Sequence, residues 1–171
     1  MDITLEPLGG EALKTLWKSA FEAHRLHRPE SYYDECLAEN AAGTRITLLA
    51  LADGQVVGCA HLKYTSSYPY FKDKHIPEIS DMNVFPEYRK RGTANKLMDE
   101  FERIVGLDHN RIGIGVGLYK DYGAAQRIYC QRGYVPDGNG VMYRDIEVVP
   151  GQTVRMDDEL VLYFVKELDY D

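Results

Sequence analysis

A basic turn between an expected strand and an expected helix is the first segment that could do chemistry. Residues 84–94 read Val-Phe-Pro-Glu-Tyr-Arg-Lys-Arg-Gly-Thr-Ala, so three adjacent cations precede a glycine. The first turn of a helix leaves backbone N–H groups unpaired at the positive end of the helix dipole, which suits an anion. We therefore expect a pyrophosphate to bind here, with a solvated basic turn as the alternative. The residues concerned are Arg89, Lys90, Arg91, Gly92, Thr93 and Ala94.

A second segment, Gly113-Ile-Gly-Val-Gly117, invites a dinucleotide interpretation and does not satisfy it. The GxGxxG fingerprint would require glycine at position 118, where the chain has Leu118. Glycines inside a strand more often mark a bulge or the close passage of another backbone or a ligand. We interpret them as strand glycines that flank a cleft, and we exclude a dinucleotide dehydrogenase.

A third segment, residues 122–134, carries a phenol on an expected helix. Ala125 and Tyr129 are four residues apart, so they share one helix face, and a small residue beside a phenol makes a shallow groove with one proton donor. The alternative is a core tyrosine with a satisfied hydroxyl, because the chain contains 13 tyrosines. Gly133 fits the C-terminal cap of this helix.

The elements that must position these segments follow from periodicity and breakers. Helical spacing of apolar residues predicts a first helix carried by residues 13–24 and a third carried by residues 97–105, with further helices over about 29–43 and 122–132. Apolar or β-rich runs predict strands over 44–52, 55–64, 78–85, 111–118, 141–149 and 160–168, with Asp53-Gly54 as a hairpin turn. Residues 65–77 read as a surface loop, and residues 136–140 interrupt a strand. This order predicts a mixed α/β fold.

Two of these segments resemble the signatures of the GCN5-related N-acetyltransferase (GNAT) superfamily. Residues 89–94 match its Q/R-x-x-G-x-G/A turn, and Ala125-x-x-Ile-Tyr129-x-x-x-Gly133-Tyr134 is similar to its A-x-x-L-Y-x-x-x-G-F segment. The resemblance implies one α/β domain over residues 1–171. Its mixed central sheet would be splayed between strands four and five and flanked by about four helices.

The same resemblance implies a reaction and its residues. Acetyl-CoA is the cosubstrate, its pantetheine pairs with the fourth strand at Met82, Asn83 and Val84, and an amine attacks the thioester directly. Tyr129 would protonate the leaving thiolate as general acid. A backbone N–H near Val84 would stabilise the developing oxyanion.

The proton acceptor and one cofactor contact stay open. Glu78 lies where the histone-acetylating branch of the family carries its base, and Asp81 is the second candidate. Family members that act on aminoglycosides often have an acid two residues after the Glu78 position, and here that residue is Ser80. The family commonly has Asn where this chain has Tyr122, so a phenol would replace an amide as donor to the cofactor, beside Ala125, or the contact would be missing.

Composition limits the setting of this chemistry. The chain has 171 residues, a net charge of −7 and a pI near 5.2, which argues against a nucleic-acid partner and suits a cationic amine. No apolar run reaches the length of a membrane span, and residues 1–4 do not resemble a signal peptide. The cysteines Cys36, Cys59 and Cys130 form no metal-binding spacing, so we expect free thiols in the cytoplasm and no metal.

These observations predict an N-acetyltransferase that moves an acetyl group from acetyl-CoA to a primary amine of a small molecule or peptide. A catalytically silent acetyl-CoA-binding sensor or interaction module is the alternative. An esterase is disfavoured because the chain has no GxSxG elbow and no legible Cys–His pairing. The amine itself is not readable. Family members are often dimers, which makes the C-terminal strands a candidate interface.

Overall fold

The computed structural model describes residues 1–169 of the chain. Backbone proximity divides the chain into two units. The first unit contains Met1–Lys63 and Ser80–Phe101, and the second contains Tyr64–Ile79 and the chain from Glu102 onward. Strand β4 (Glu78–Val84) and helix α4 (Thr93–Val105) contribute residues to both units. Each unit is described separately below.

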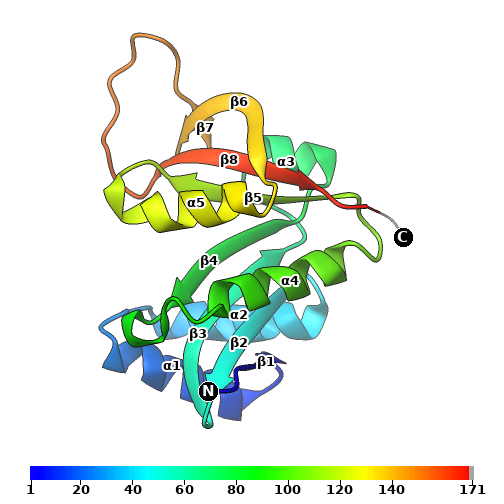
Figure 1. The fold of residues 1–171 in the computed structure, drawn as a ribbon, viewed down its shortest axis with the longest axis vertical. Coiled ribbons are helices and arrows are strands. Elements are labelled where there is room, and N and C mark those ends of the chain that lie inside the picture. The colour runs from blue at the N-terminus through cyan, green and yellow to red at the C-terminus, as the bar shows by residue number, and fades with distance from the viewer. Residues whose placement is uncertain (170–171) are drawn as a thin grey trace. The chain divides into compact units, whose positions relative to one another are not determined.

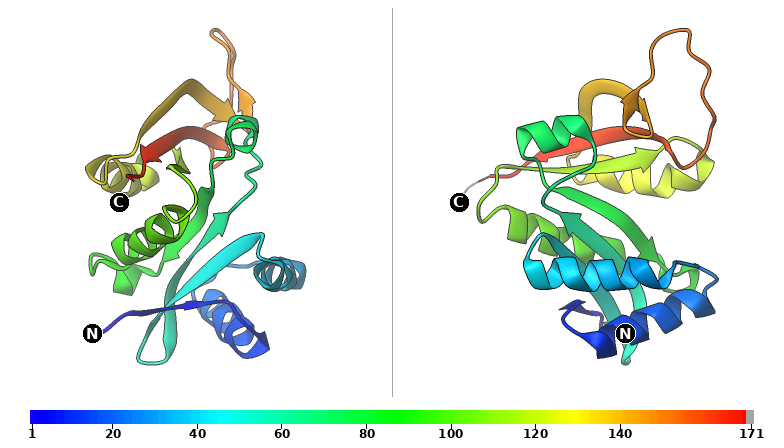
Figure 2. Two further views of the ribbon diagram at one scale, coloured as in Figure 1. Left: turned by 90° about the vertical axis from the view of Figure 1, so that its right-hand side faces the viewer. Right: turned by 180° about the vertical axis from the view of Figure 1, so that it is seen from behind.

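The first unit combines an antiparallel hairpin with helices on both of its faces. Its elements are β1 (Thr4–Pro7), α1 (Glu11–Ala23), α2 (Glu30–Ala42), β2 (Arg45–Ala52), β3 (Gln55–Lys63), most of β4, the short 3-10 helix η1 (Pro86–Tyr88) and the start of α4. Helices α1 and α2 cover one face of the hairpin and α4 covers the other (Figure 2). The hairpin turns at Asp53 and Gly54, which both adopt positive φ as a tight turn requires.

Successive side chains of β2 point to opposite faces of this hairpin, and each face carries its own hydrophobic core. Leu49 and Leu51 face α1 and α2, where they join Trp17 and Phe21 in a cluster that also contains Tyr33, Cys36, Cys59 and Phe85. Ala50 and Ala52 point the opposite way and pack with Ile3 and Val57. The period of two in a half-buried strand therefore determines which side chains meet each helix layer.

The second unit is built on antiparallel strands. Its elements are α3 (Pro69–Lys74), the start of β4, the end of α4, β5 (Arg111–Gly117), the short 3-10 helix η2 (Lys120–Tyr122), α5 (Gly123–Gln131), β6 (Val135–Tyr143), β7 (Ile146–Glu147) and β8 (Leu160–Glu167). Helices α3 and α5 lie on opposite faces of β5, β8 and β6, and residues 148–159 form a long loop before β8 (Figure 1). An aromatic cluster of Tyr68, Phe71 and Tyr163 packs α3 against the strands.

The expected mixed α/β class is confirmed. In the described residues the strand order is β1-β2-β3-β4-β5-β8-β6-β7. Strands β4 and β5 are parallel, with Glu78 opposite Gly113 and Ile79 opposite Ile114. The β2–β3, β5–β8 and β6–β8 pairs are antiparallel.

Two local expectations were wrong, and a third, the interruption at 136–140, was met as an irregularity of strand pairing. Residues 65–77, expected to be a loop, contain α3, which Pro69 begins at N1 and His75 ends in the left-handed region while Phe71 is fully buried. The interruption expected at 136–140 is a register shift within β6, between Pro136 and Val141. The strand expected over 141–149 is a hairpin whose turn at Arg144 and Asp145 has positive φ at both residues. The short strand β1 and two 3-10 turns were not predicted at all.

No helix in the described residues is both long and apolar enough to cross a membrane. Residues 1–169 also contain no group of three His, Cys, Asp or Glu side chains arranged to hold a metal ion.

Candidate active site

The basic turn of the first unit lies between η1 and α4, so it precedes a helix as the sequence predicts. Lys90 has a φ of 59° and Gly92 a φ of 82°, and a Cβ added at Gly92 would find no atom within 4 Å. The Lys96 N–H donates to the Gly92 carbonyl at 2.9 Å, so helical bonding begins at the glycine. Exposed cations, a left-handed glycine with open space and a helix N-terminus are what a pyrophosphate requires, and the turn has all three.

Two of the three cations are oriented by their own unit. Arg89 Nε donates to the Val84 carbonyl at 3.0 Å, which ties the turn to the end of β4, and the Arg91 guanidinium lies 6.0 Å from the centroid of the Tyr88 ring. Thr93, at the first turn of α4, is 2% exposed, and its hydroxyl has no hydrogen-bond partner among residues 1–169. The assignment of residues 89–94 to a ligand stays a prediction.

The end of β4 is held by unusually close packing on β3. A Cβ at Gly58 would lie 2.7 Å from the Asn83 carbonyl oxygen and 3.3 Å from Val84 Cα. The Phe85 N–H also donates to the Val57 carbonyl at 3.0 Å. Only glycine therefore permits this approach of the two backbones. Met82, Asn83 and Val84, the predicted pantetheine contacts, are half-buried here.

Tyr129, the predicted acid, lies in α5 of the second unit. Its side chain is 8% exposed, and burial raises the pKa of its hydroxyl to about 12. That hydroxyl donates to no group in the described part of the chain. The neighbouring Tyr134, by contrast, donates to Glu102 at 3.0 Å. Tyr129 thus keeps its proton available, and the half-buried Ala125 lies one helical turn before it.

Glu78, the predicted base, lies at the start of β4 in the second unit. It is 8% exposed, and its carboxylate accepts a short hydrogen bond from the hydroxyl of the buried Ser66. The same serine oxygen accepts from the Tyr68 N–H at 3.0 Å. The carboxylate is therefore held in place by the segment before α3. Whether it takes a proton from a substrate stays a prediction.

Tyr122 occupies the position where the resemblance implies asparagine. Its hydroxyl donates to Asp158 at 2.7 Å, and Tyr119 donates to the same carboxylate oxygen. Its ring fills the space left by Gly117, where a Cβ would lie 2.3 Å from a ring carbon. The pKa of Tyr122 is raised by burial and by the Asp158 carboxylate. Its proton is thus committed to the 148–159 loop, and its cofactor contact stays a prediction.

The glycines of β5 are explained by aromatic rings. A Cβ at Gly113 would lie 2.3 Å from the Phe71 ring, and one at Gly115 would lie 2.9 Å from Tyr163. Together with the Tyr122 ring against Gly117, these contacts give each glycine a packing reason within the second unit. The expectation that they flank a cleft stays a prediction.

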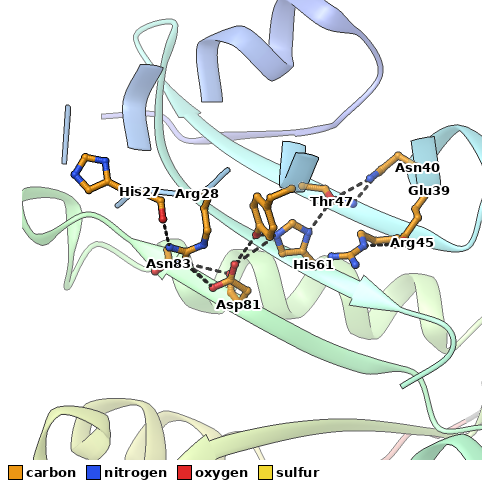
Figure 3. Close-up of polar contacts among 10 residues, drawn as sticks. His27, Arg28, Glu39, Asn40, Arg45, Thr47, His61, Asp81 and Asn83 are labelled. Atoms are coloured by element: carbon orange, nitrogen blue, oxygen red, sulfur yellow. Dashed lines mark hydrogen bonds and ion pairs between the residues drawn. The ribbon is translucent and has the colours of Figure 1, made fainter. Parts of the chain in front are cut away.

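A polar network surrounds Asp81 in the first unit (Figure 3). The sequence did not predict that these residues contact one another. Tyr32 Oη donates a short hydrogen bond to Asp81 Oδ2 and lies 3.0 Å from His61 Nε2. His61 Nδ1 lies 2.8 Å from Thr47 Oγ1, which accepts from Asn40 Nδ2 at 2.9 Å. Four elements contribute to it, namely α2, β2, β3 and β4. Sequence reasoning named Asp81 as a candidate base but missed the residues behind it.

Burial and neighbouring donors set the charge states in this network. His61 is fully buried, which lowers its pKa to about 3, so its ring is neutral. Burial alone would raise the pKa of Asp81, but the Tyr32 hydrogen bond, the Arg28 guanidinium and the Asn83 amide outweigh it and lower that pKa. Asp81 is therefore an ionised carboxylate whose side chain is 34% exposed.

A family model gives an independent comparison. The model of the acetyltransferase (GNAT) family matches residues 10–134, which include the basic turn, β4 and α5. The chain has no match among curated protein sequences.

Solved structures show the same fold at low identity. A structure from Desulfovibrio desulfuricans assigned to the GNAT family has a TM-score of 0.72 at 15% identity, covering 98% of this chain and 100% of that one. A spermidine N-acetyltransferase chimera that includes the Vibrio cholerae enzyme has a TM-score of 0.67 at 13% identity, covering 98% of this chain and 96% of that one. An aminoglycoside 6'-N-acetyltransferase complexed with coenzyme A has a TM-score of 0.65 at 15% identity, covering 99% of this chain and 98% of that one.

Proposed function

This chain belongs to the acetyltransferase (GNAT) family and is therefore an acetyl-CoA-dependent N-acetyltransferase. We propose that it moves the acetyl group directly to a primary amine of a small molecule or peptide. The observation that carries this proposal is Tyr129, a buried phenol in the family's second signature whose proton is donated to no described group. A leaving thiolate needs a proton, and a phenol with a pKa of about 12 retains one at neutral pH.

The cofactor would be held by the first unit. The N–H groups and side chains of residues 89–94 would bind the pyrophosphate, and the backbone of Met82 to Val84 would pair with the pantetheine. The fit rests on the open, left-handed Gly92, the start of a 13-residue helix and the exposed cations. In the second unit, Tyr122 and Ala125 would contribute further cofactor contacts.

The amine must lose a proton, since free amines are mostly ammonium at neutral pH. Glu78 and Asp81 are the proposed acceptors of that proton. Glu78 is buried and bonded by Ser66, whereas Asp81 is partly exposed, ionised and bonded by Tyr32. Both therefore have fixed carboxylates, in different units.

Tyr129→Phe tests the proposal, with Tyr134→Phe as the matched control. We expect Tyr129→Phe to lower kcat for thiol release at least about a hundredfold, as loss of a general acid does, with little change in acetyl-CoA binding. Tyr134→Phe should leave kcat nearly unchanged, because the signature usually has Phe there. Full activity of Tyr129→Phe would contradict the assignment.

Thermal unfolding with and without acetyl-CoA separates binding from catalysis. A ligand that binds only the folded state raises the midpoint. A rise without thiol release on any amine would favour the silent sensor, and no rise at millimolar acetyl-CoA would contradict both functions.

Cys130→Ser tests direct transfer, since this cysteine is exposed in α5 next to Tyr129. We expect no loss of activity, whereas a large loss would indicate an acyl-cysteine.

A further inference from the structure

The hydrogen bonds around Asp81 can run in only one direction. A carboxylate accepts only, so the single proton of Tyr32 Oη goes to Asp81. The Tyr32 oxygen must then accept from His61 Nε2, which places the ring proton of the neutral imidazole on that nitrogen. His61 Nδ1 is left as an acceptor and receives the Thr47 hydroxyl proton. The chain of donors therefore starts at Asn40 and ends at Asp81.

This series of hydrogen bonds does not conduct protons to solvent. Its far end is the Asn40 side chain, whose second amide hydrogen goes to the Cys36 carbonyl and whose oxygen accepts from the Thr47 N–H. An amide has no proton to release at neutral pH. The network therefore orients Asp81 and keeps it ionised, and Tyr32, His61 and Thr47 are positioning residues.

The backbone at Asp81 is strained in a way that no turn explains. Asp81 has a φ of 47° in the middle of β4, in the left-handed region that L-residues avoid. Such outliers persist where the surroundings fix them, and they cluster at ligand sites. Asn83 Nδ2 donates to Asp81 Oδ1 at 3.0 Å, which adds a second fixed contact to the carboxylate.

A cation with unused donors lies beside this carboxylate. Arg28 Nη2 is 3.4 Å from Asp81 Oδ1, and Arg28 Nη1 donates to the His27 carbonyl at 3.3 Å. The guanidinium also lies 5.7 Å from the Phe21 ring centroid and 5.6 Å from that of Tyr32. A guanidinium has five N–H groups, so three have no partner among residues 1–169. The contact to Asp81 is long and not bidentate, hence weak.

We propose that Asp81 and Arg28 form an acceptor subsite for an amine that carries its own carboxylate, the arrangement of an amino acid. The ammonium would bind the exposed part of the Asp81 carboxylate, and the substrate carboxylate would bind the unused N–H groups of Arg28. This subsite rests on the proposed acetyl transfer and specifies its substrate class. A fixed cation beside Asp81 also disfavours polyamines and aminoglycosides, which would bring further ammonium groups against it.

The test compares each amino acid with its carboxamide. Thiol release from acetyl-CoA is measured for a panel of L-amino acids, their carboxamides, spermidine and an aminoglycoside, in the wild type and in Arg28→Gln. Acid and amide differ in amine basicity, so the decisive quantity is the change in their kcat/KM ratio on substitution. We expect Arg28→Gln to lower kcat/KM for the acid about ten- to a hundredfold and for the amide less than about twofold, as loss of a charged hydrogen bond does.

Matched variants guard against a folding defect. Arg25→Gln changes an exposed arginine of the same segment and should leave the ratio unchanged. Arg28→Lys keeps the charge and should lose less than Arg28→Gln. Asp81→Asn should lower kcat/KM for acid and amide alike. If Asp81→Asn fails to fold, the ratio in the Arg28 variants decides.

The outcomes separate this proposal from the one on which it rests. Preferred acetylation of spermidine or the aminoglycoside, or an acid-to-amide ratio that Arg28→Gln leaves unchanged, would overturn the subsite while acetyl transfer stands. If acetyl-CoA raises the unfolding midpoint but no amine is acetylated, acetyl transfer fails. Calorimetric titration of amino acids into the protein with coenzyme A then tests the subsite directly, and absence of Arg28-dependent binding overturns it.

Discussion

Tyr32–Asp81 in the first unit and Tyr163–Asp145 in the second are the same chemical pair in two settings. In both, a tyrosine donates a short hydrogen bond to an aspartate with positive φ, 47° at Asp81 and 63° at Asp145. Asp145 lies in the hairpin turn between β6 and β7, which requires that conformation. Asp81 lies inside a strand, which does not.

The neighbours of the two aspartates also differ: those of Asp145 belong to a turn and an aromatic cluster, whereas those of Asp81 are a buried imidazole and a cation. Asp145 has a second donor, Ser67 at 3.0 Å, and its tyrosine stacks on Tyr68 with ring centroids 3.8 Å apart. That pair ties a turn to an aromatic core. Asp81 is backed by the fully buried His61 and faces Arg28. Strain required by a turn is structural, whereas strain inside a strand, supported by a buried network, indicates a binding role.

Among the variants, glycine substitutions should show the largest difference between the two units in the loss of free energy of unfolding. Gly58→Ala would place Cβ 2.7 Å from the Asn83 carbonyl oxygen, so β4 itself must move. Gly115→Ala meets only side chains, Tyr163 and Val161, at 2.9 Å. We expect Gly58→Ala to lower the free energy of unfolding by about 3 kcal/mol and Gly115→Ala by about 1 kcal/mol. Urea denaturation at constant m-value measures both.

The activities of these variants sharpen the comparison. If Gly58→Ala shifts β4, it should also weaken acetyl-CoA binding, because Met82 to Val84 are the proposed pantetheine contacts. Gly115→Ala should retain binding once it is folded. Equal stability losses with equal retention of binding would show that the close β3–β4 approach has no role beyond packing.

Local motifs were predictable from the sequence, and the network was not. The basic turn and Tyr129 each lie in a run of a few residues, so spacing alone places them on a turn and a helix face. Helix α3 was missed because it has only six residues, too few for a periodic signal.

The residues behind Asp81 come from three elements, α2, β2 and β3. Tyr32 and Asp81 are 49 residues apart, Tyr32 and His61 are 29 apart, and Thr47 and His61 are 14 apart. Such partners meet only through strand register and helix packing, which composition does not reveal. A lone histidine in a strand of β-rich, apolar residues was the one available signal, since a buried imidazole requires partners.

Removing one hydroxyl from each tyrosine–aspartate pair should have an intermediate effect. Tyr32→Phe leaves the His61 Nε2–H buried without an acceptor, so we expect a loss of about 2 kcal/mol. Tyr163→Phe keeps the stack on Tyr68 and leaves Ser67 bonded to Asp145, so we expect about 0.5 kcal/mol. Chemical denaturation of both variants measures this, and equal losses would contradict the distinction between the two pairs.

The smallest expected effect concerns pH, and it contrasts two histidines of the first unit. His24 Nδ1 lies 2.7 Å from the Ala20 carbonyl and Nε2 lies 2.6 Å from a Glu87 carboxylate oxygen. Both partners only accept, so the two hydrogen bonds together require the protonated, imidazolium form of His24. Glu87 raises the pKa of His24, whereas burial lowers that of His61 to about 3. The two residues must therefore contribute to stability with opposite dependence on pH.

The sign for each histidine follows from proton linkage. The stability due to the His24 pair is present below the unfolded pKa, near 6.5, and is lost as pH rises through the raised folded value. The burial of neutral His61 has the reverse effect, because only the unfolded chain gains its proton between about pH 6.5 and 3. His24→Gln should therefore destabilise the protein more at pH 5.5 than at pH 8.5, as measured by urea midpoints. The exposed His27→Gln serves as control, and a His24→Gln loss that is independent of pH would show that His24 acts only through its stacking on Phe85.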